Sequence, residues 1–371
     1  MIDAPAAPAT ISRRAKLTID VGPLFEDQWT GISVFTRRLI QALIKHEDVQ
    51  LAYAANLVEI ATEAVLRALA FESGGVLGDA RESRPLELVK TVDPSAPLFY
   101  PMTRAKFGAI GRDASTVHDL STLFMPENHV ETNVAYNLDH FERELRTNEA
   151  VFCISEATRA GMATAFPSVA GKLRLLPQYV DWPETFETLD RNLPPIRLGA
   201  FAAVVGTIEP RKNLALLLEA LEHPRLAALD LTFVVIGKPG WLVDSSADRL
   251  TAEQRKRVVF TGFVSEFVKY RLLKAAQFLI FPSVFEGFGI PALEAMSLGK
   301  PVLAARSSSL PEVIGGAGCF FDPYSQDDFL SALEEIAAPR KLADLAPIAR
   351  AQNARYTPER MARPVAEWAR G

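Results

Sequence analysis

The sequence has little cysteine and no long apolar run. Its 371 residues include two cysteines, Cys153 and Cys319, which are too few for a disulfide framework or a thiolate metal site. Each lies in apolar surroundings, so we expect both to be buried small hydrophobic residues in a reducing compartment. No stretch approaches the roughly 18 consecutive apolar residues that a membrane-spanning helix needs. Any membrane contact is therefore expected at the surface only.

The beginning of the chain also lacks an apolar segment. Its first ten residues, MIDAPAAPAT, contain one acid and two prolines, which predicts a flexible tail over residues 1–14 and not a signal peptide. We expect a cytoplasmic protein that can lie at the inner face of the cytoplasmic membrane.

Basic residues are scarce in the first half of the chain. Residues 1–190 carry 18 Lys and Arg against 26 Asp and Glu, whereas residues 191–371 carry 22 against 19. The acidic first half argues against a nucleic acid partner, and the mildly basic second half can host a diphosphate. The length favours two domains, and 49% hydrophobic with 23% charged residues is ordinary for a soluble globular protein.

The most informative stretch is FPSVFEGFGIPALEAMSLGKPV, residues 281–302. The apolar run 277–281 predicts a buried strand, and a loop with Gly287 and Gly289 follows it. Residues 291–298 combine an initial proline with helix formers and an apolar face, and residues 302–305 predict a second strand. Such strand-loop-helix-strand units build parallel sheets.

Two carboxylates stand in this unit, Glu286 in the loop and Glu294 in the helix. A helix start offers free N–H groups and a positive dipole end to an anion such as phosphate, and Gly289 lets a diphosphate approach the backbone. Glu294 can then accept hydrogen bonds from ribose hydroxyls, while Glu286 meets what lies beyond the phosphate. Two solvated acids at a helix end explain these residues equally well.

The same strand-loop-helix order occurs elsewhere. Gly31 precedes a helix predicted over 33–46, where it can let a phosphate reach the backbone or can simply form a turn. Arg211 and Lys212 precede a helix predicted over 214–221, where they can add positive charge to an anion site or can be ordinary surface charges.

Other segments carry weaker signals. A strand ends at His118 and Asp119, in the position where parallel sheets keep ligands, although a capped loop is the simpler explanation. Arg104 and Lys106 form a basic, aromatic loop that can face an acceptor or a lipid headgroup or can be a solvated surface loop. Further predictions cover structure alone: Ser155 as a helix N-cap, the serine run 307–309 as the cap of another helix, residues 181–195 as an interdomain linker, and an amphipathic helix over 356–370.

A known family shares the frame E-G-F-G-x-x-x-x-E, present here as Glu286, Gly287, Phe288, Gly289 and Glu294. It resembles the signature of the retaining nucleotide-sugar glycosyltransferases of family 4, which have the GT-B fold. The E-P-R-K-N string at 209–213 and the G-K-P-G-W string at 237–241 most resemble those of the mannosyl- and rhamnosyl-transferring members. The resemblance implies an α/β protein with two doubly wound Rossmann-like domains that face each other across a cleft. The expected domains are an acceptor-side domain over 15–190, completed by the C-terminal helix 357–371, and a nucleotide-sugar-binding domain over 191–356.

The resemblance also implies roles for individual residues. The expected catalytic residues are Glu286, His118, Arg211 and Lys212. The expected donor-binding residues are Gly31, Gly206, Arg211, Lys212, Phe263, Val264, Gly287, Phe288, Gly289, Ile290 and Glu294, and Asp119, Arg104 and Lys106 are candidates for the acceptor side. No D-x-D metal motif is present, so we expect no metal and no cofactor, and cations and helix ends must stabilise the leaving diphosphate.

The function implied is metal-independent transfer of a hexose, with retention of configuration, to a hydroxyl of a glycan or lipid-linked oligosaccharide in surface polysaccharide biosynthesis. No residue is an obvious double-displacement nucleophile, and the resemblance therefore points to front-face transfer assisted by the leaving phosphate, with Glu286 in contact with the sugar. GDP-mannose is the first choice of donor, and UDP- or dTDP-sugars such as dTDP-rhamnose are the alternatives. A phosphorylase or epimerase of the same fold and a non-catalytic nucleotide-sugar or glycan-binding partner remain as other candidates.

Overall fold

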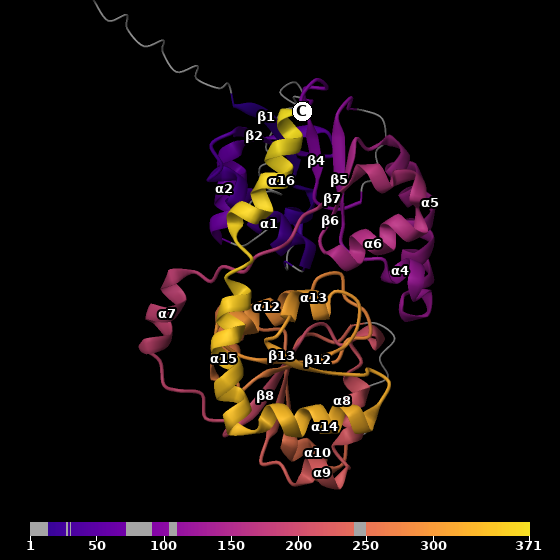
Figure 1. Ribbon diagram of the computed structural model, residues 1–371. Coiled ribbons are helices and arrows are strands. Elements are labelled where there is room, and N and C mark those ends of the chain that lie inside the picture. Colours follow the sequence, from indigo (N-terminus) through magenta and orange to yellow (C-terminus); the bar gives the residue numbers. More distant parts are fainter. Residues whose placement is uncertain (1–13, 27–28, 30, 72–90, 104–109, 241–249) are drawn as a thin grey trace, which may run out of the picture. The chain divides into compact units, whose positions relative to one another are not determined.

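The structure is a computed structural model, and it describes residues 14–26, 29, 31–71, 91–103, 110–240 and 250–371 (Figure 1). These residues form two compact units. The first contains the described residues up to Ser115, together with 147–150 and 358–371, and the second contains 116–146 and the described residues of 151–357.

One sheet has the strand order β3-β2-β1-β4-β5-β6-β7. Its strands are β1 (Ala15–Asp20), β2 (Val49–Ala55), β3 (Val58–Ile60), β4 (Leu98–Tyr100), β5 (Asp113–Val117), β6 (Ala150–Cys153) and β7 (Leu173–Leu175). β1 pairs in parallel with β2 and β4, as do β4 with β5 and β6 with β7, whereas β3 is antiparallel to β2.

The second sheet lies within the second unit and has the order β10-β9-β8-β11-β12-β13, with parallel neighbours throughout. Its strands are β8 (Phe201–Val205), β9 (Thr232–Ile236), β10 (Val258–Gly262), β11 (Leu279–Phe281), β12 (Val302–Ala305) and β13 (Gly318–Phe321). The chain builds outward from β8 in one direction and then returns to build from β11 in the other. In such doubly wound sheets, ligands bind beside the carboxyl ends of the strands at this reversal.

Helices and 3-10 turns connect the strands. They are η1 (Gly22–Phe25), α1 (Gly31–Ile44), α2 (Thr62–Phe71), α4 (Ser121–Phe124), η3 (Pro126–Asn128), α5 (Glu131–Thr147), α6 (Glu156–Ala165), η4 (Pro167–Lys172), α7 (Glu184–Arg191), η5 (Pro210–Lys212), α8 (Leu214–Ala220), α9 (Pro224–Ala227), α10 (Ala252–Arg257), α11 (Glu266–Ala275), α12 (Ile290–Ser297), α13 (Leu310–Ile314), α14 (Gln326–Ala337), α15 (Pro339–Asn353) and α16 (Pro358–Arg370).

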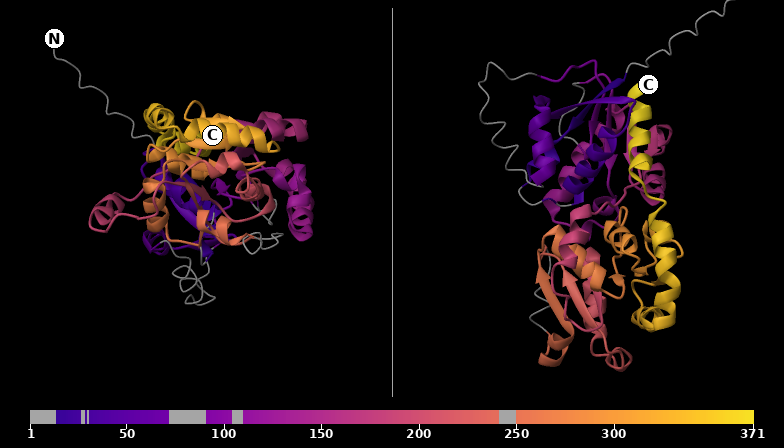
Figure 2. Two further views of the ribbon diagram at one scale, coloured as in Figure 1. Left: turned by 90° about the horizontal axis from the view of Figure 1, so that it is seen from below. Right: turned by 90° about the vertical axis from the view of Figure 1, so that its left-hand side faces the viewer.

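Apolar helix faces close both cores. In the second unit, α12 packs on β11 and β12 and against α15, and α14 packs on β12, β13 and α8. In the first unit, the C-terminal α16, yellow in Figures 1 and 2, packs against α1 and β1. Arg112 fixes the end of α16, because its Nη2 donates to the carbonyl of Trp368 at 2.7 Å and its guanidinium lies over the Trp368 ring.

Several local predictions can be compared with the structure. The α/β class is confirmed, both cysteines are buried as expected, and the Ser155 hydroxyl accepts from the N–H of Thr158 as the N-cap of α6. The predicted linker 181–195 differs, because it contains the helix α7. Its prolines lie at the ends of this helix, where proline is tolerated, so they do not prevent it.

Among the described residues, no helix has both the length and the apolar content to span a membrane.

Candidate functional site

Two loops of the second unit bring three of the predicted catalytic residues together. One follows β8 and contains Arg211 and Lys212, and the other follows β11 and contains Glu286. β8 and β11 are paired neighbours, with Leu279 opposite Ala203, so both loops leave the same end of the sheet at the reversal of strand order. The N–H of Val284 donates to the carbonyl of Arg211 at 2.9 Å and ties the two loops directly.

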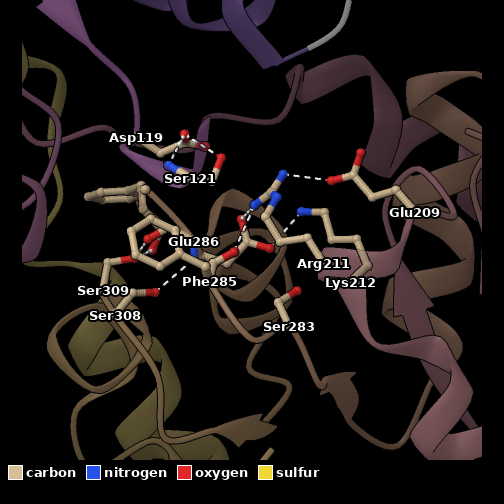
Figure 3. Close-up of polar contacts among 12 residues, drawn as sticks. Asp119, Ser121, Glu209, Arg211, Lys212, Ser283, Phe285, Glu286, Ser308 and Ser309 are labelled. Carbon is tan, nitrogen blue, oxygen red and sulfur yellow. Dashed lines mark hydrogen bonds and ion pairs between the residues drawn. The ribbon is translucent and has the colours of Figure 1, made fainter. Parts of the chain in front are cut away.

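Ion pairs join the side chains of these loops (Figure 3). Lys212 Nζ lies 2.6 Å from Glu286 Oε1, and Arg211 Nη1 lies 3.4 Å from Glu286 Oε2. Arg211 also donates through Nη2 to Glu209 Oε1 at 2.7 Å and through Nη1 to the carbonyl of Phe285 at 2.7 Å. A planar guanidinium can make all these contacts from one orientation, and it is thereby fixed.

The charges in this cluster hold one another in the ionised state. Burial would raise the pKa of Glu286, which is 8% exposed, but Lys212 and Arg211 outweigh burial and keep this pKa below its ordinary value. Burial would likewise lower the pKa of Arg211, yet Glu286, Asp119 and Glu209 outweigh it and raise that pKa. Glu286 is therefore a carboxylate at neutral pH, beside two cations.

A run of serines fixes the loop that carries Glu286. The N–H of Glu286 donates to Ser308 Oγ at 2.7 Å, and Ser309 Oγ lies 3.0 Å from the Glu286 carbonyl and 2.9 Å from the Phe288 carbonyl. The serine run lies at the start of α13 as predicted, with Ser309 at the N-cap position, but Ser309 makes no side-chain cap bond. The Ser309 hydroxyl donates to carbonyls of the loop that carries Glu286 instead.

His118 and Asp119 reach this loop from the end of β5. A Cβ atom on Gly287 would stand 1.8 Å from the carbonyl oxygen of His118, so only glycine allows this approach. The Asp119 carboxylate accepts from the N–H and the hydroxyl of Ser121, at 3.0 and 2.7 Å. Burial would raise the pKa of Asp119, but Arg211 and these bonds lower it.

Glu294 lies in α12, which begins directly after this loop. The N-cap of α12 is Gly289 with φ of +105°, a conformation that favours glycine. Glu294 is 1% exposed, and its Oε1 accepts from Lys269 Nζ of α11 at 2.9 Å. Burial would lower the pKa of Lys269, but Glu294 and Glu266 outweigh it and raise this pKa.

The remaining predicted donor-binding residues of the second unit lie at strand or helix ends. Gly206 follows β8 and lines a small pocket with Lys212, Phe281 and Ser283. Phe263 follows β10 and is 56% exposed, and Val264 after it is half-buried. Phe288 is buried against Tyr356, and Ile290 is the first residue of α12.

Three predicted residues belong to other parts of the chain. Gly31 begins α1 of the first unit, and Arg104 and Lys106 lie outside the described residues. Within the described ranges, no group of three or more His, Cys, Asp or Glu side chains is arranged to hold a metal ion.

The arrangement can bind and stabilise an anion. Lys212 has three N–H donors and uses one on Glu286, so others can meet a phosphate oxygen. The neighbouring start of α12 adds backbone N–H groups. Fixed cations of this kind stabilise negative charge that develops on a leaving group.

Sequence reasoning missed several supporting residues. Glu209 orients Arg211, the serines orient Glu286, and Lys269 pairs with Glu294. Glu209 lies two positions before Arg211, so the sequence contained a local signal for this contact. Lys269 is 25 positions from Glu294, and its local spacing indicates only an ion pair with Glu266 on its own helix.

Comparison with known proteins places the chain in a family. The family model for glycosyl transferases group 1 matches residues 191–351. O-antigen chain mannosyltransferase B of Escherichia coli is 31% identical over 295 residues, which cover 74% of this chain and 75% of that protein.

Solved structures show the same fold. Sucrose-phosphate synthase from Thermosynechococcus elongatus has a TM-score of 0.67 at 19% identity, over 96% of this chain and 98% of that chain. Anabaena HepE in complex with UDP-glucose has a TM-score of 0.64 at 17% identity, over 95% and 99%. The family and fold predicted from the E-G-F-G-x-x-x-x-E frame are thus confirmed, and the chain belongs to the group 1 glycosyl transferases, with the GT-B fold.

Proposed function

We propose that this glycosyltransferase is a retaining, metal-independent mannosyltransferase that uses GDP-mannose. Its acceptor is a hydroxyl of a glycan or lipid-linked oligosaccharide in surface polysaccharide biosynthesis. The observation that carries the proposal is the cluster of Arg211 and Lys212 around Glu286 at the reversal point of the second sheet. The two cationic side chains can bind a donor diphosphate.

In the proposed reaction, the bond between the sugar C1 and the diphosphate oxygen breaks while the acceptor oxygen bonds to C1 on the same face. The acceptor proton passes to the departing phosphate oxygen, which acts as the base. Arg211 and Lys212 stabilise the charge on the diphosphate, so the reaction requires no metal ion. Glu286 contacts the sugar, His118 reaches it from β5, and Asp119 positions the acceptor side.

Similarity supports mannose as the sugar. The Escherichia coli relative is named as an O-antigen chain mannosyltransferase, whereas the similar HepE structure contains UDP-glucose. UDP- or dTDP-sugars are therefore the alternative donors. A non-catalytic binding partner is disfavoured because Arg211 and Lys212 are present and form ion pairs with Glu286.

The decisive experiment measures donor hydrolysis and transfer over a panel of GDP-mannose, UDP-glucose and dTDP-rhamnose, with and without EDTA. We expect turnover with GDP-mannose that EDTA leaves unchanged, and an α-linked product. Turnover with UDP-glucose or dTDP-rhamnose but not with GDP-mannose would contradict the assignment of mannose as the transferred sugar. Tight binding without turnover of any donor or acceptor would support the binding-partner alternative.

Glu294→Ala is expected to raise the dissociation constant for GDP about tenfold or more, because charge-assisted hydrogen bonds are worth about 1.5–3 kcal/mol. The turnover number at saturating donor should change much less. Calorimetric titration with GDP measures the affinity, and Glu253→Ala, which removes an exposed acid of α10 paired with Lys256, is the control. Equal dissociation constants for GDP in the two variants would contradict the contact between Glu294 and the ribose.

Gly31→Ala is expected to affect donor binding without lowering the stability of the first unit. A Cβ atom at this position meets no other atom within 4 Å, and alanine favours a helix over glycine by about 1 kcal/mol. We expect unchanged or higher resistance to urea together with a several-fold higher KM for the donor, because the methyl group blocks the diphosphate. An unchanged KM would show that Gly31 is only a turn residue.

A further inference from the structure

Glu294 is held by residues that lie outside the motifs of the donor site. Its carboxylate is almost completely buried, and Lys269 Nζ lies 2.9 Å from Oε1. The same ammonium group lies 2.7 Å from Glu266 Oε1 and is 15% exposed. Because a buried charge without a partner is unfavourable, the ion pair with Lys269 stabilises the Glu294 side chain in α12.

Trp182 covers this ion pair from the segment before α7. Lys269 Nζ stands over the Trp182 ring, 5.7 Å from its centroid, in an arrangement that attracts a cation to the face of the ring. Trp182 Nε1 also donates to Ser297 Oγ at 2.8 Å, and Ser297 Oγ donates to the carbonyl of Glu294 at 2.7 Å. Trp182 therefore supports Glu294 in two ways. It contacts Lys269, which pairs with the Glu294 carboxylate, and it contacts Ser297, which donates to the Glu294 backbone carbonyl.

The segment that carries Trp182 is itself fixed on α11. Tyr270 donates its hydroxyl to Glu187 of α7 at 2.6 Å, and Arg271 Nε donates to Asp190 at 2.7 Å. The Tyr270 ring also packs edge-on against Trp182, with the centroids 5.4 Å apart. These contacts hold the Trp182 ring in one place relative to Lys269.

We propose that Lys269 is a positioning residue for the donor, which together with Trp182 holds the Glu294 carboxylate in the orientation that accepts hydrogen bonds from the ribose hydroxyls. The inference rests on the proposed function, because it requires a donor with a ribose.

The test compares a nucleoside diphosphate with its 2′,3′-dideoxy analogue, using the full chain and calorimetric titration. The probe is whichever of GDP and UDP binds the wild type more tightly. We expect the wild type to lose about tenfold in affinity when the hydroxyls are removed. Lys269→Met should bind the intact nucleotide about tenfold more weakly and lose most of this discrimination, with the turnover number at saturating donor within about threefold. Lys269→Arg, which keeps the charge, should recover part of the affinity for the intact nucleotide and part of the discrimination against the dideoxy analogue.

Lys256→Met is the matched control, since it removes an exposed lysine that pairs with Glu253 in α10, and it should behave as the wild type. If Lys269→Met does not fold, Trp182→Leu keeps both charges and should weaken binding and discrimination about threefold. A wild type that binds neither nucleotide overturns the proposed function and this inference with it. The other outcome concerns a wild type that binds the nucleoside diphosphate more tightly than its dideoxy analogue. If Lys269→Met or Trp182→Leu shows the same difference in affinity, this inference alone is overturned.

Discussion

Arg211→Met is expected to lower the turnover number at least about a hundredfold, because losing one fixed donor to a developing anion typically costs 10²–10³ in rate. The variant should also be less stable. Arg211 is the partner of two largely buried acids, Glu209 and Glu286, and breaking a buried ion pair costs about 3–5 kcal/mol. Steady-state kinetics and urea unfolding measure the two effects separately.

Two further variants decide how Arg211 acts. Arg211→Lys keeps one charge but loses the planar fork that reaches Glu209 and Phe285 together, so we expect it to recover stability better than turnover. Arg225→Met removes a surface arginine that pairs with Glu334 and should match the wild type in both measurements. Turnover in Arg211→Met within threefold of the wild type would contradict its role at the diphosphate.

Gly287→Ala is expected to have the other large effect, a loss of about a hundredfold or more in turnover with a loss of about 1–3 kcal/mol in stability. The added Cβ would stand 1.8 Å from the His118 carbonyl oxygen and 2.9 Å from Asp119 Cβ, so the loop or the end of β5 must move. Overpacking of this kind destabilises by the stated amount. A displacement of about 1 Å between reacting groups can cost about a hundredfold.

Gly171→Ala is the control for this variant, because a Cβ atom there meets nothing within 4 Å. Kinetics and urea unfolding of the two alanine variants, side by side, measure the effect of the contact with His118. If Gly287→Ala were as active and as stable as Gly171→Ala, the close approach of these two segments would be contradicted.

Local chemistry was sufficient to predict much of this protein. The strand ending at Phe281, the glycine loop and the helix with Glu294 follow from hydrophobic pattern and from proline and glycine positions over some twenty residues. Arg211 and Lys212 were recognised in the same way, as charges just before a helix. The domain boundary near residue 190 stays a prediction, as do the catalytic and binding roles of the individual residues.

Tertiary structure decided which of these local features meet. Lys212 and Glu286 are 74 positions apart, and no spacing in the sequence indicates their contact. They pair because β8 and β11 are neighbours at the reversal of strand order, which depends on how the whole sheet packs. The serine run begins α13 as predicted, but the hydroxyls of Ser308 and Ser309 bond to a loop that only the folded sheet brings near.

By itself, the sequence determined the family, the α/β class and the pair of acids in the E-G-F-G-x-x-x-x-E frame, because these depend on residues close together in the chain. The fold alone decided that Glu286 pairs with two cations and that Glu294 pairs with Lys269, whose ammonium group lies over the Trp182 ring. The physical reason is that a buried charge needs a partner within about 4 Å in space. Distance along the chain places no limit on where that partner comes from.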